Sequence, residues 1–395
     1  MAHVYFLDES VYLCDRLSMR IACQQEDLHR GLSAVARAIP TRTTLPITQH
    51  VLLEAEGDHL TLSATDAETI AITYRIDAKV DEAGSITLPS RLISDFVATL
   101  PREEITMKLA ERSRQVSLAC VRNTASIGGM DPDDFPPIPT VEGSDSITIE
   151  APRLRTAIAQ TVFSAATDDS RPVLTGVHFH FGGGSLRLAA ADGFRLSVHT
   201  MPIESKFERA VIVPARALSE LGRLLSEAAE GKVEITFNPA GTQVQFDVGH
   251  ARLTANLIQG TFPNYEQLIP AQRTTRTEVA VAEFMRETRI ASIFARDGSG
   301  IVRIIATPGE ASEPGRLVIT ARAEEVGNNE GILDAVVEGT EAKIAFNGRY
   351  LMDVLNVLDA DRVAIETTSP SSPGVLRPVG NDRFVHVVMP MFVQW

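Results

Sequence analysis

Cysteine is scarce in this chain of 395 residues, which contains three: Cys14, Cys23 and Cys120. Three scattered thiols provide neither a disulfide framework nor the ligand spacing of a zinc site, so we expect reduced cysteines in a cytoplasmic protein. Long apolar runs are also missing, because none approaches the roughly 18 residues needed to cross a membrane. The segment from Met1 to Ser18 lacks the basic start and the cleavage site of a signal peptide. We interpret it as an N-terminal extension or a mis-assigned start.

Positive charge is in the minority. Lys and Arg together number 37 against 51 Asp and Glu, and the formal net charge is −14. Nucleic-acid binding depends on Lys and Arg at the phosphates, so this balance argues at first sight against it. It indicates instead a protein with an acidic outer surface. A nucleic-acid function would require the few positive charges to be gathered in one place.

Motifs for catalysis and cofactors are missing as well. The sequence has neither G-x-x-x-x-G-K-[ST] nor G-x-G-x-x-G, so it shows no phosphate-binding loop. His178 and His180 lack a third ligand, and a solvated strand face explains them better than a metal site. Asp131 and its acidic neighbours lie among prolines, which is typical of a linker. Ser, His and Asp occur without a nucleophile signature, so we expect no enzyme activity, no metal and no cofactor.

A threefold repeat organises the chain, with copies about 130 residues apart. One motif alternates apolar and polar residues after a turn, which is typical of strand–turn–strand structure. Its copies are Leu60–Asp66, Leu186–Asp192 and the weaker Leu317–Ala323. A second motif ends in arginine and is followed by a stripe of apolar residues at helical spacing. Its copies are Ile86–Arg91, Ile212–Arg216 and Ile344–Arg349.

Another helix is expected to open each unit, over Glu26–Ile39, Ala151–Ala165 and Val281–Phe294. The predicted fold class is therefore α+β, with three similar domains at 19–141, 142–271 and 272–395 after the segment 1–18. Units of this size are too large for a solenoid and suggest a curved or closed array.

Arginines recur on or just after the three opening helices. They are Arg30, Arg37 and Arg42, then Arg153 and Arg155, then Arg286, Arg289 and Arg296. Each one alone is compatible with an ordinary solvated helix face. If the helices face one concavity, however, an acidic protein gains a basic inner wall with salt-sensitive, sequence-independent phosphate contacts.

Several short motifs, in their order and spacing, resemble bacterial DNA polymerase III beta subunits, the replication sliding clamps. They are Thr44–Ile47, Ala191–Leu196, Phe262–Tyr265 with Pro270, Phe346–Asn347 with Tyr350, and Val387–Met391. The resemblance covers Met19 to about Val393 and implies three DNA-clamp domains per chain. Two chains would form a head-to-tail homodimer, a six-domain ring that encircles duplex DNA. Such a protein is a processivity factor, which tethers the replicative polymerase and other partners and is loaded by a separate clamp loader.

The resemblance also implies functional residues. A groove between the second and third domains would bind short partner peptides, and we call its eleven members the groove residues: Leu174, Gly193, Phe194, Arg195, Leu196, Pro263, Leu268, Val387, Met389, Pro390 and Met391. The DNA contacts would be Arg42 and Arg171, with Arg153 and Arg155 on the second opening helix. The dimer interface would join Ile293 and Phe294 to Ala125 and Ile127 of the other chain.

Three features depart from the family pattern: the segment 1–18, the missing Asp in the third repeat, and the tail Phe392–Trp395. Two large apolar side chains on the tail are expected either to pack at the groove rim or to belong to a disordered end. Two other functions remain open from the residues alone. One is an α+β enzyme with a site between repeats, and the other is a monomeric adaptor that kept the fold without closing a ring.

Overall fold

The computed structural model describes residues 18–110, 113–141, 146–204, 207–227, 231–295, 300–310, 313–323 and 327–395. The chain divides into two compact units. One contains residues up to Ala151 together with Arg223–Leu257, and the other contains Pro152–Gly222 and Ile258–Trp395. The central repeat therefore contributes to both units.

The first repeat follows the predicted order of elements. They are β1 (Met19–Gln24), α1 (Gln25–Val35), β2 (His50–Glu56), β3 (His59–Thr65), β4 (Ile70–Asp77), β5 (Lys79–Glu82), β6 (Gly84–Pro89), α2 (Ser90–Thr99), β7 (Glu104–Leu109), β8 (Gln115–Cys120) and β9 (Asn123–Gly128). Helix α1 buries Leu28, Leu32 and Val35, as its apolar spacing predicts. It ends before the predicted Ile39, because a 3-10 turn follows and the residue before a proline avoids helical dihedrals.

The central repeat has the same plan. Its elements are β10 (Ser146–Glu150), α3 (Ala151–Thr161), β11 (Gly176–Gly182), β12 (Ser185–Ala191), β13 (Arg195–Pro202), β14 (Arg209–Pro214), α4 (Ala215–Glu227), β15 (Lys232–Phe237), β16 (Gln243–Asp247) and β17 (Ala251–Asn256). The turn between β11 and β12 needs Gly183 and Gly184, which have φ values of 58° and 71°.

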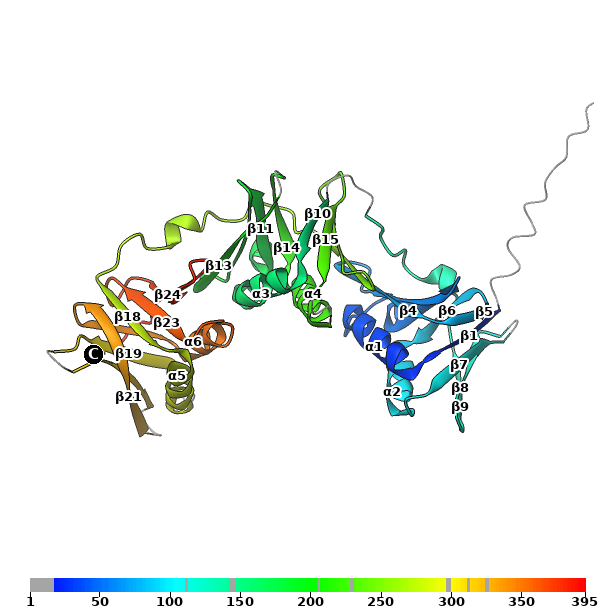
Figure 1. Cartoon of the computed structure of the whole chain (residues 1–395), viewed down its shortest axis with the longest axis horizontal. Coiled ribbons are helices and arrows are strands. Elements are labelled where there is room, and N and C mark those ends of the chain that lie inside the picture. The colour runs from blue at the N-terminus through cyan, green and yellow to red at the C-terminus, as the bar shows by residue number, and fades with distance from the viewer. Residues whose placement is uncertain are drawn as a thin grey trace, which may run out of the picture. The chain divides into compact units, whose positions relative to one another are not determined.

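The third repeat completes the series. It comprises β18 (Thr275–Ala280), α5 (Val281–Ala295), β19 (Ile301–Thr307), β20 (Gly315–Ala323), β21 (Gly327–Gly339), β22 (Ala342–Asn347), α6 (Gly348–Leu355), β23 (Arg362–Thr367), β24 (Gly374–Pro378) and β25 (Phe384–Val388). Helices α5 and α6 lie beside each other (Figure 1) and contribute Phe284, Ala291, Leu351 and Val354 to one buried core with the strands.

Strand pairing joins consecutive repeats. The last strand of the central repeat, β17, pairs antiparallel with β4, and the last strand of the third repeat, β25, pairs antiparallel with β13. Strands β4 and β13 occupy equivalent places, each directly after the hairpin of the first motif. The strands left over are β9, the last strand of the first repeat, and β21, which follows the corresponding hairpin of the third repeat. By the same rule β9 should pair with β21. In the part of the chain that is described, β9 instead ends its sheet beyond β8, and Gly327–Ala335 of β21 pairs only with β20.

Buried polar groups line the surface where β13 meets β25. The Ser197 hydroxyl lies 2.8 Å from both the Ser164 hydroxyl and Nδ1 of His386. Nδ1 of His199 lies 2.7 Å from the Gln160 side-chain oxygen. The pKa of His386 is lowered to about 3 and that of His199 to about 4. Burial is the main cause of both shifts, and the positive charge of nearby arginines is the second. Both rings are therefore neutral in the folded protein near neutral pH.

These histidines predict that the free energy of unfolding falls on mild acidification. The unfolded chain takes up protons below its ordinary histidine pKa near 6.5, whereas the folded chain resists protonation until about pH 4 or below. Stability should be constant above pH 6.5 and fall towards pH 5 by at most about 1.4 kcal/mol per pH unit for each histidine. Urea unfolding at each pH measures this.

The variant His386→Asn should show a weaker dependence over that range, and His29→Asn, at an exposed histidine of α1, provides the matched control. An unchanged slope in His386→Asn would contradict the assignment.

Candidate functional site

The groove residues surround the end of the β13–β25 pair. Leu196 pairs with Val387, and the Met389 N–H donates a 2.8 Å hydrogen bond to the Phe194 carbonyl, which extends the pair beyond β25. Leu174 comes from the 3-10 turn Pro172–Thr175. Leu174, Leu196 and Val387 are buried together in one apolar cluster. These three residues therefore form the floor of the site and are core residues as well.

Other groove residues expose apolar side chains above that floor. Phe194 is 58% exposed, Leu268 50% and Met389 43%, and Pro263 is exposed as well. Pro263 and Leu268 lie in the segment whose Phe262 and Tyr265 pack into the same buried cluster. Large exposed apolar side chains gathered over one cluster are typical of a binding surface, whereas single ones are ordinary.

The turn between β12 and β13 holds Phe194 in place. Oδ1 of Asp192 accepts the N–H groups of Phe194 at 2.9 Å and Arg195 at 3.0 Å. Gly193 has a φ of 93°, which favours glycine. The Arg171 guanidinium lies over Gly193 and donates to the Asp192 carbonyl at 3.0 Å, so a β-carbon at Gly193 would crowd it. Arg171, expected as a DNA contact, is an exposed residue that packs on this turn.

Arg195 is the one charged side chain among the groove residues, and it is almost fully buried. Its guanidinium forms ion pairs with Asp192 at 3.0 Å and with Asp353 of α6 at 2.6 Å, and it donates to the Phe163 carbonyl. It also stacks over the Tyr350 ring at 4.4 Å. Five donors on a planar group suit such a set of partners. Arg195 therefore braces β13 against α6, a role that sequence reasoning did not identify.

The C-terminal end starts beside the site. The Met391 N–H donates to the Ala345 carbonyl of β22 at 2.7 Å, which fixes the start of the tail. Pro390 and Met391 are partly buried. Phe392 is 87% exposed, so the expectation that it packs at the groove rim is wrong for this residue. One backbone hydrogen bond ties Met391 to β22, and the Phe392 side chain is exposed to solvent instead.

The predicted DNA contacts differ in their environment. Arg42 is exposed in the loop after α1, and Arg155 is exposed on α3. Arg153 is partly buried and donates to the Pro202 carbonyl at 3.0 Å. On α5, Arg289 is exposed, and Arg286 pairs with Glu287. Arg296, Cys14 and the segment 1–17 lie outside the described residues.

The expected dimer residues lie on β9 and α5. Ile127 is buried within its own repeat, whereas Ala125 is partly exposed. Ile293 is 58% exposed and Phe294 is partly buried against the core of the third repeat. The sequence analysis did not single out Ile332 and Val336, two exposed apolar residues of β21. Strand β21 is long, and only the observed strand pairing reveals that one edge of Gly327–Ala335 has no partner among the described residues.

The Ser197–His386 contact resembles part of a hydrolase site, yet both residues are fully buried, so a substrate cannot reach them. His178 is also not solvated as expected, because its ring stacks on Phe262 at 5.1 Å. Burial is the main cause that lowers the pKa of His178 to about 4. Among the described residues, no group of three His, Cys, Asp or Glu is arranged to hold a metal, and no helix is long and apolar enough to cross a membrane.

Comparison with known proteins places three consecutive family models on the chain. The N-terminal, central and C-terminal domains of the DNA polymerase III beta subunit match residues 19–139, 148–264 and 266–392. The beta sliding clamp of Synechocystis sp. is 33% identical in an alignment 395 positions long. That alignment covers 94% of this chain and 99% of that protein.

Solved structures agree with this assignment. The DNA polymerase sliding clamp from Bacillus subtilis has a TM-score of 0.87 at 26% identity, covering 95% of this chain and 100% of that one. A sliding clamp from Pseudomonas aeruginosa, crystallised with griselimycin, has a TM-score of 0.85 at 28% identity with the same coverage. The chain therefore belongs to the DNA polymerase III beta subunit family, the bacterial sliding clamps.

Proposed function

We propose that two copies of this chain form a head-to-tail ring in which β9 of one copy pairs with Gly327–Ala335 of β21 in the other. The supporting observation is that the equivalent pairing occurs twice within the chain, at β4 with β17 and at β13 with β25. Among the described residues, the two remaining edges, on β9 and β21, have no such partner. Unpaired strand edges readily accept another strand. Exposed Ile293 and Ile332 near this edge would add apolar contact, and Ala125 would meet them from β9.

The ring would act as a non-catalytic processivity factor in the cytoplasm. It would encircle duplex DNA and hold it through its topology rather than through base contacts. Arg42 and Arg155 are exposed, so their guanidinium groups could meet phosphates. Arg153 and Arg171 would contribute more weakly, since each already donates to a backbone carbonyl. Loading would need a separate clamp loader.

The domains would divide at 19–141, 142–271 and 272–395. Partner proteins, including polymerase subunits, would bind the groove residues with short peptides that carry a glutamine and two or three apolar side chains. Phe194, Leu268 and Met389 supply exposed apolar contact above a rigid floor. Flexible methionines suit a surface that accepts several sequences.

Ring closure predicts that Ile332, an exposed apolar residue of β21, controls the oligomeric state. The variant Ile332→Asp should be monomeric at micromolar concentration, because the contact would bury an unpaired charge. The control Leu92→Asp changes an equally exposed apolar residue of α2 and should remain dimeric. Sedimentation equilibrium distinguishes the two, and a wild-type monomer would contradict the proposal.

Topological binding predicts that the loaded protein stays on nicked circular DNA and is released when that DNA is linearised. Arg42→Glu should slow loading onto DNA. It should lower the salt dependence of DNA binding only slightly, since one phosphate contact changes the slope of log affinity against log salt concentration by about one. Equal retention on circular and linear DNA would rule out encirclement.

The site predicts different effects for groove residues that reach the surface, fully or in part, and for those in the buried floor. Phe194→Ala and Met391→Ala should each weaken peptide binding by about 1–2 kcal/mol while the melting temperature hardly changes. Leu196→Ala should instead lower stability by about 2–5 kcal/mol, because it leaves a cavity in the core. Calorimetry with a labelled peptide and thermal melts measure both. Unchanged affinity in Phe194→Ala and Met391→Ala would reject the peptide site.

A further inference from the structure

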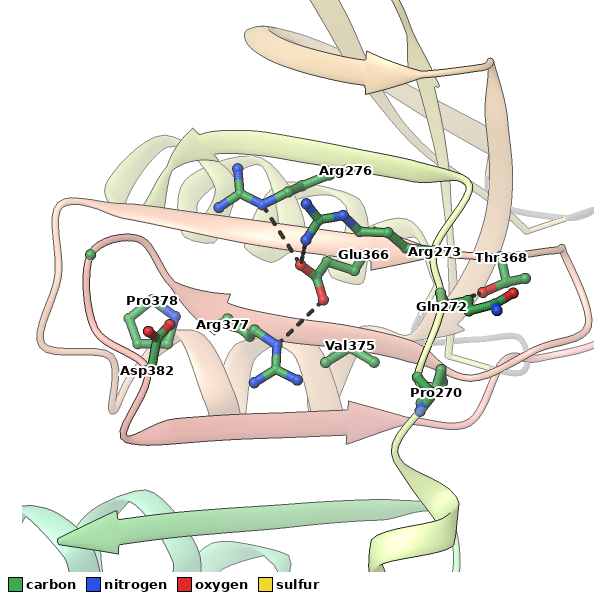
Figure 2. A pocket seen from close by; sticks show the side chains of 12 residues that line it. Pro270, Gln272, Arg273, Arg276, Glu366, Thr368, Val375, Arg377, Pro378 and Asp382 are labelled. Carbon is green, nitrogen blue, oxygen red and sulfur yellow. Dashed lines mark hydrogen bonds and ion pairs between the residues drawn. The ribbon is translucent and has the colours of Figure 1, made fainter. Parts of the chain in front are cut away.

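A polar pocket of about 540 Å³ lies on the third repeat, outside the groove residues. Its lining includes Arg273 of the linker before β18, Arg276 of β18, Glu366 of β23 and Arg377 of β24. Figure 2 shows the Glu366 carboxylate in the middle of the three arginines. Sequence reasoning did not single out any of these residues, because they are distant in the chain and belong to no motif.

Glu366 holds the three guanidinium groups together. Its carboxylate pairs with Arg273, lies 3.7 Å from Nε of Arg276 and lies 3.3 Å from Nε of Arg377. Only 13% of the Glu366 side chain is exposed, so its arginine partners satisfy most of the carboxylate's hydrogen-bonding capacity. Arg276 also pairs with Glu278. Arg273 and Arg377 remain 48% and 31% exposed, so both face the open pocket.

The charge of the pocket selects the kind of ligand. Three arginines line it against two acidic residues, Glu366 and Asp382. The neighbouring Glu278 pairs with Arg362 as well as with Arg276, so four arginines against three acids leave one positive charge in a chain of net charge −14. Each guanidinium carries five donors, and one buried carboxylate cannot satisfy three of them. A single carboxylate would balance the excess charge, whereas a doubly charged phosphate would meet repulsion from the two acids already present.

The pocket continues from the groove residues. Val375 lines the pocket, pairs with Val387 across β24 and β25, and belongs to the same buried cluster as Leu174 and Leu196. Pro270, also in the lining, follows the exposed Leu268 by two residues along the linker. A peptide that leaves the groove residues along this linker would therefore reach the arginines.

We propose that this pocket binds carboxylate side chains that flank the apolar residues of partner peptides. The inference rests on the proposed peptide function and extends it, since it adds a charge requirement to an otherwise apolar recognition. Glu366 serves as a positioning residue, because it keeps the arginines extended towards the pocket before a ligand arrives. Charge-assisted hydrogen bonds to planar guanidinium groups are short and directional.

Synthetic peptides test the proposal directly. Each contains one glutamine, two leucines and one phenylalanine, and carries one aspartate or one asparagine at either its N-terminal or its C-terminal side. With the full-length protein at low salt, the aspartate peptide of one orientation should bind about five- to tenfold more tightly than its asparagine counterpart. The difference should shrink as salt is added.

Variants then locate the effect. Arg273→Gln and Arg377→Gln should remove the preference for aspartate while the asparagine peptide binds as before. Arg316→Gln, an exposed arginine of β20 that also pairs with a glutamate, is the matched control and should keep the preference. Equal binding of the aspartate and asparagine peptides to the wild type would overturn the proposal, and so would a preference that survives in both pocket variants.

Two further outcomes are decisive. If the asparagine peptides bind and aspartate adds nothing, only the pocket proposal fails and the peptide function stands. If no peptide binds, the peptide function fails and the pocket proposal fails with it. Peptides with phosphoserine in place of aspartate test the alternative anion, and a stronger preference for phosphoserine would contradict a carboxylate site.

Discussion

Antiparallel strand pairing between repeats is the interaction on which the remaining structure depends. A sheet edge carries unpaired N–H and C=O groups, which are stable only when water or another strand satisfies them. Two of the three equivalent edge pairs are satisfied within the chain, by β4 with β17 and by β13 with β25. Three repeats in one chain can form only two such junctions. The third junction requires a second copy, and two copies that meet at both pairs of free edges would close into a six-domain ring.

The same pairing positions the proposed peptide site. Strands β13 and β25 continue as far as Phe194 and Met389, where the pairing ends and the side chains emerge into solvent. Below this point Arg195 joins β13 to α6 through Asp353, and the buried Ser197–His386 contact joins β13 to β25. A rigid base of this kind lowers the ordering cost when a flexible peptide binds. If the arginine pocket binds peptide carboxylates as proposed, electrostatics would add selectivity to this apolar contact.

The sequence predicted those parts of the fold that depend on local patterns. Apolar spacing identified the helices, and the turns before the first motif, Gly57–Asp58 and Gly182–Gly184, identified hairpins, since both signals act over a few residues. The repeat and the short motifs identified the family and the three domains. The direction of a side chain could not be predicted in this way. Arg195 points to α6 rather than to a ligand, and Ile127, expected at the dimer interface, is buried within its own repeat, because tertiary packing decides both.

The free edges of β9 and β21 were equally invisible to sequence reasoning, since an unpaired strand has the same pattern as a paired one. Amide hydrogen exchange across a concentration series tests their pairing most directly. The account predicts slow exchange in Asn123–Gly128 and Gly327–Ala335 at high concentration and faster exchange in both segments together on dilution. The amides of β13 and β25 should remain protected throughout, because their pairing lies within one chain. Exchange rates in the two edge segments that do not change with concentration would contradict the account.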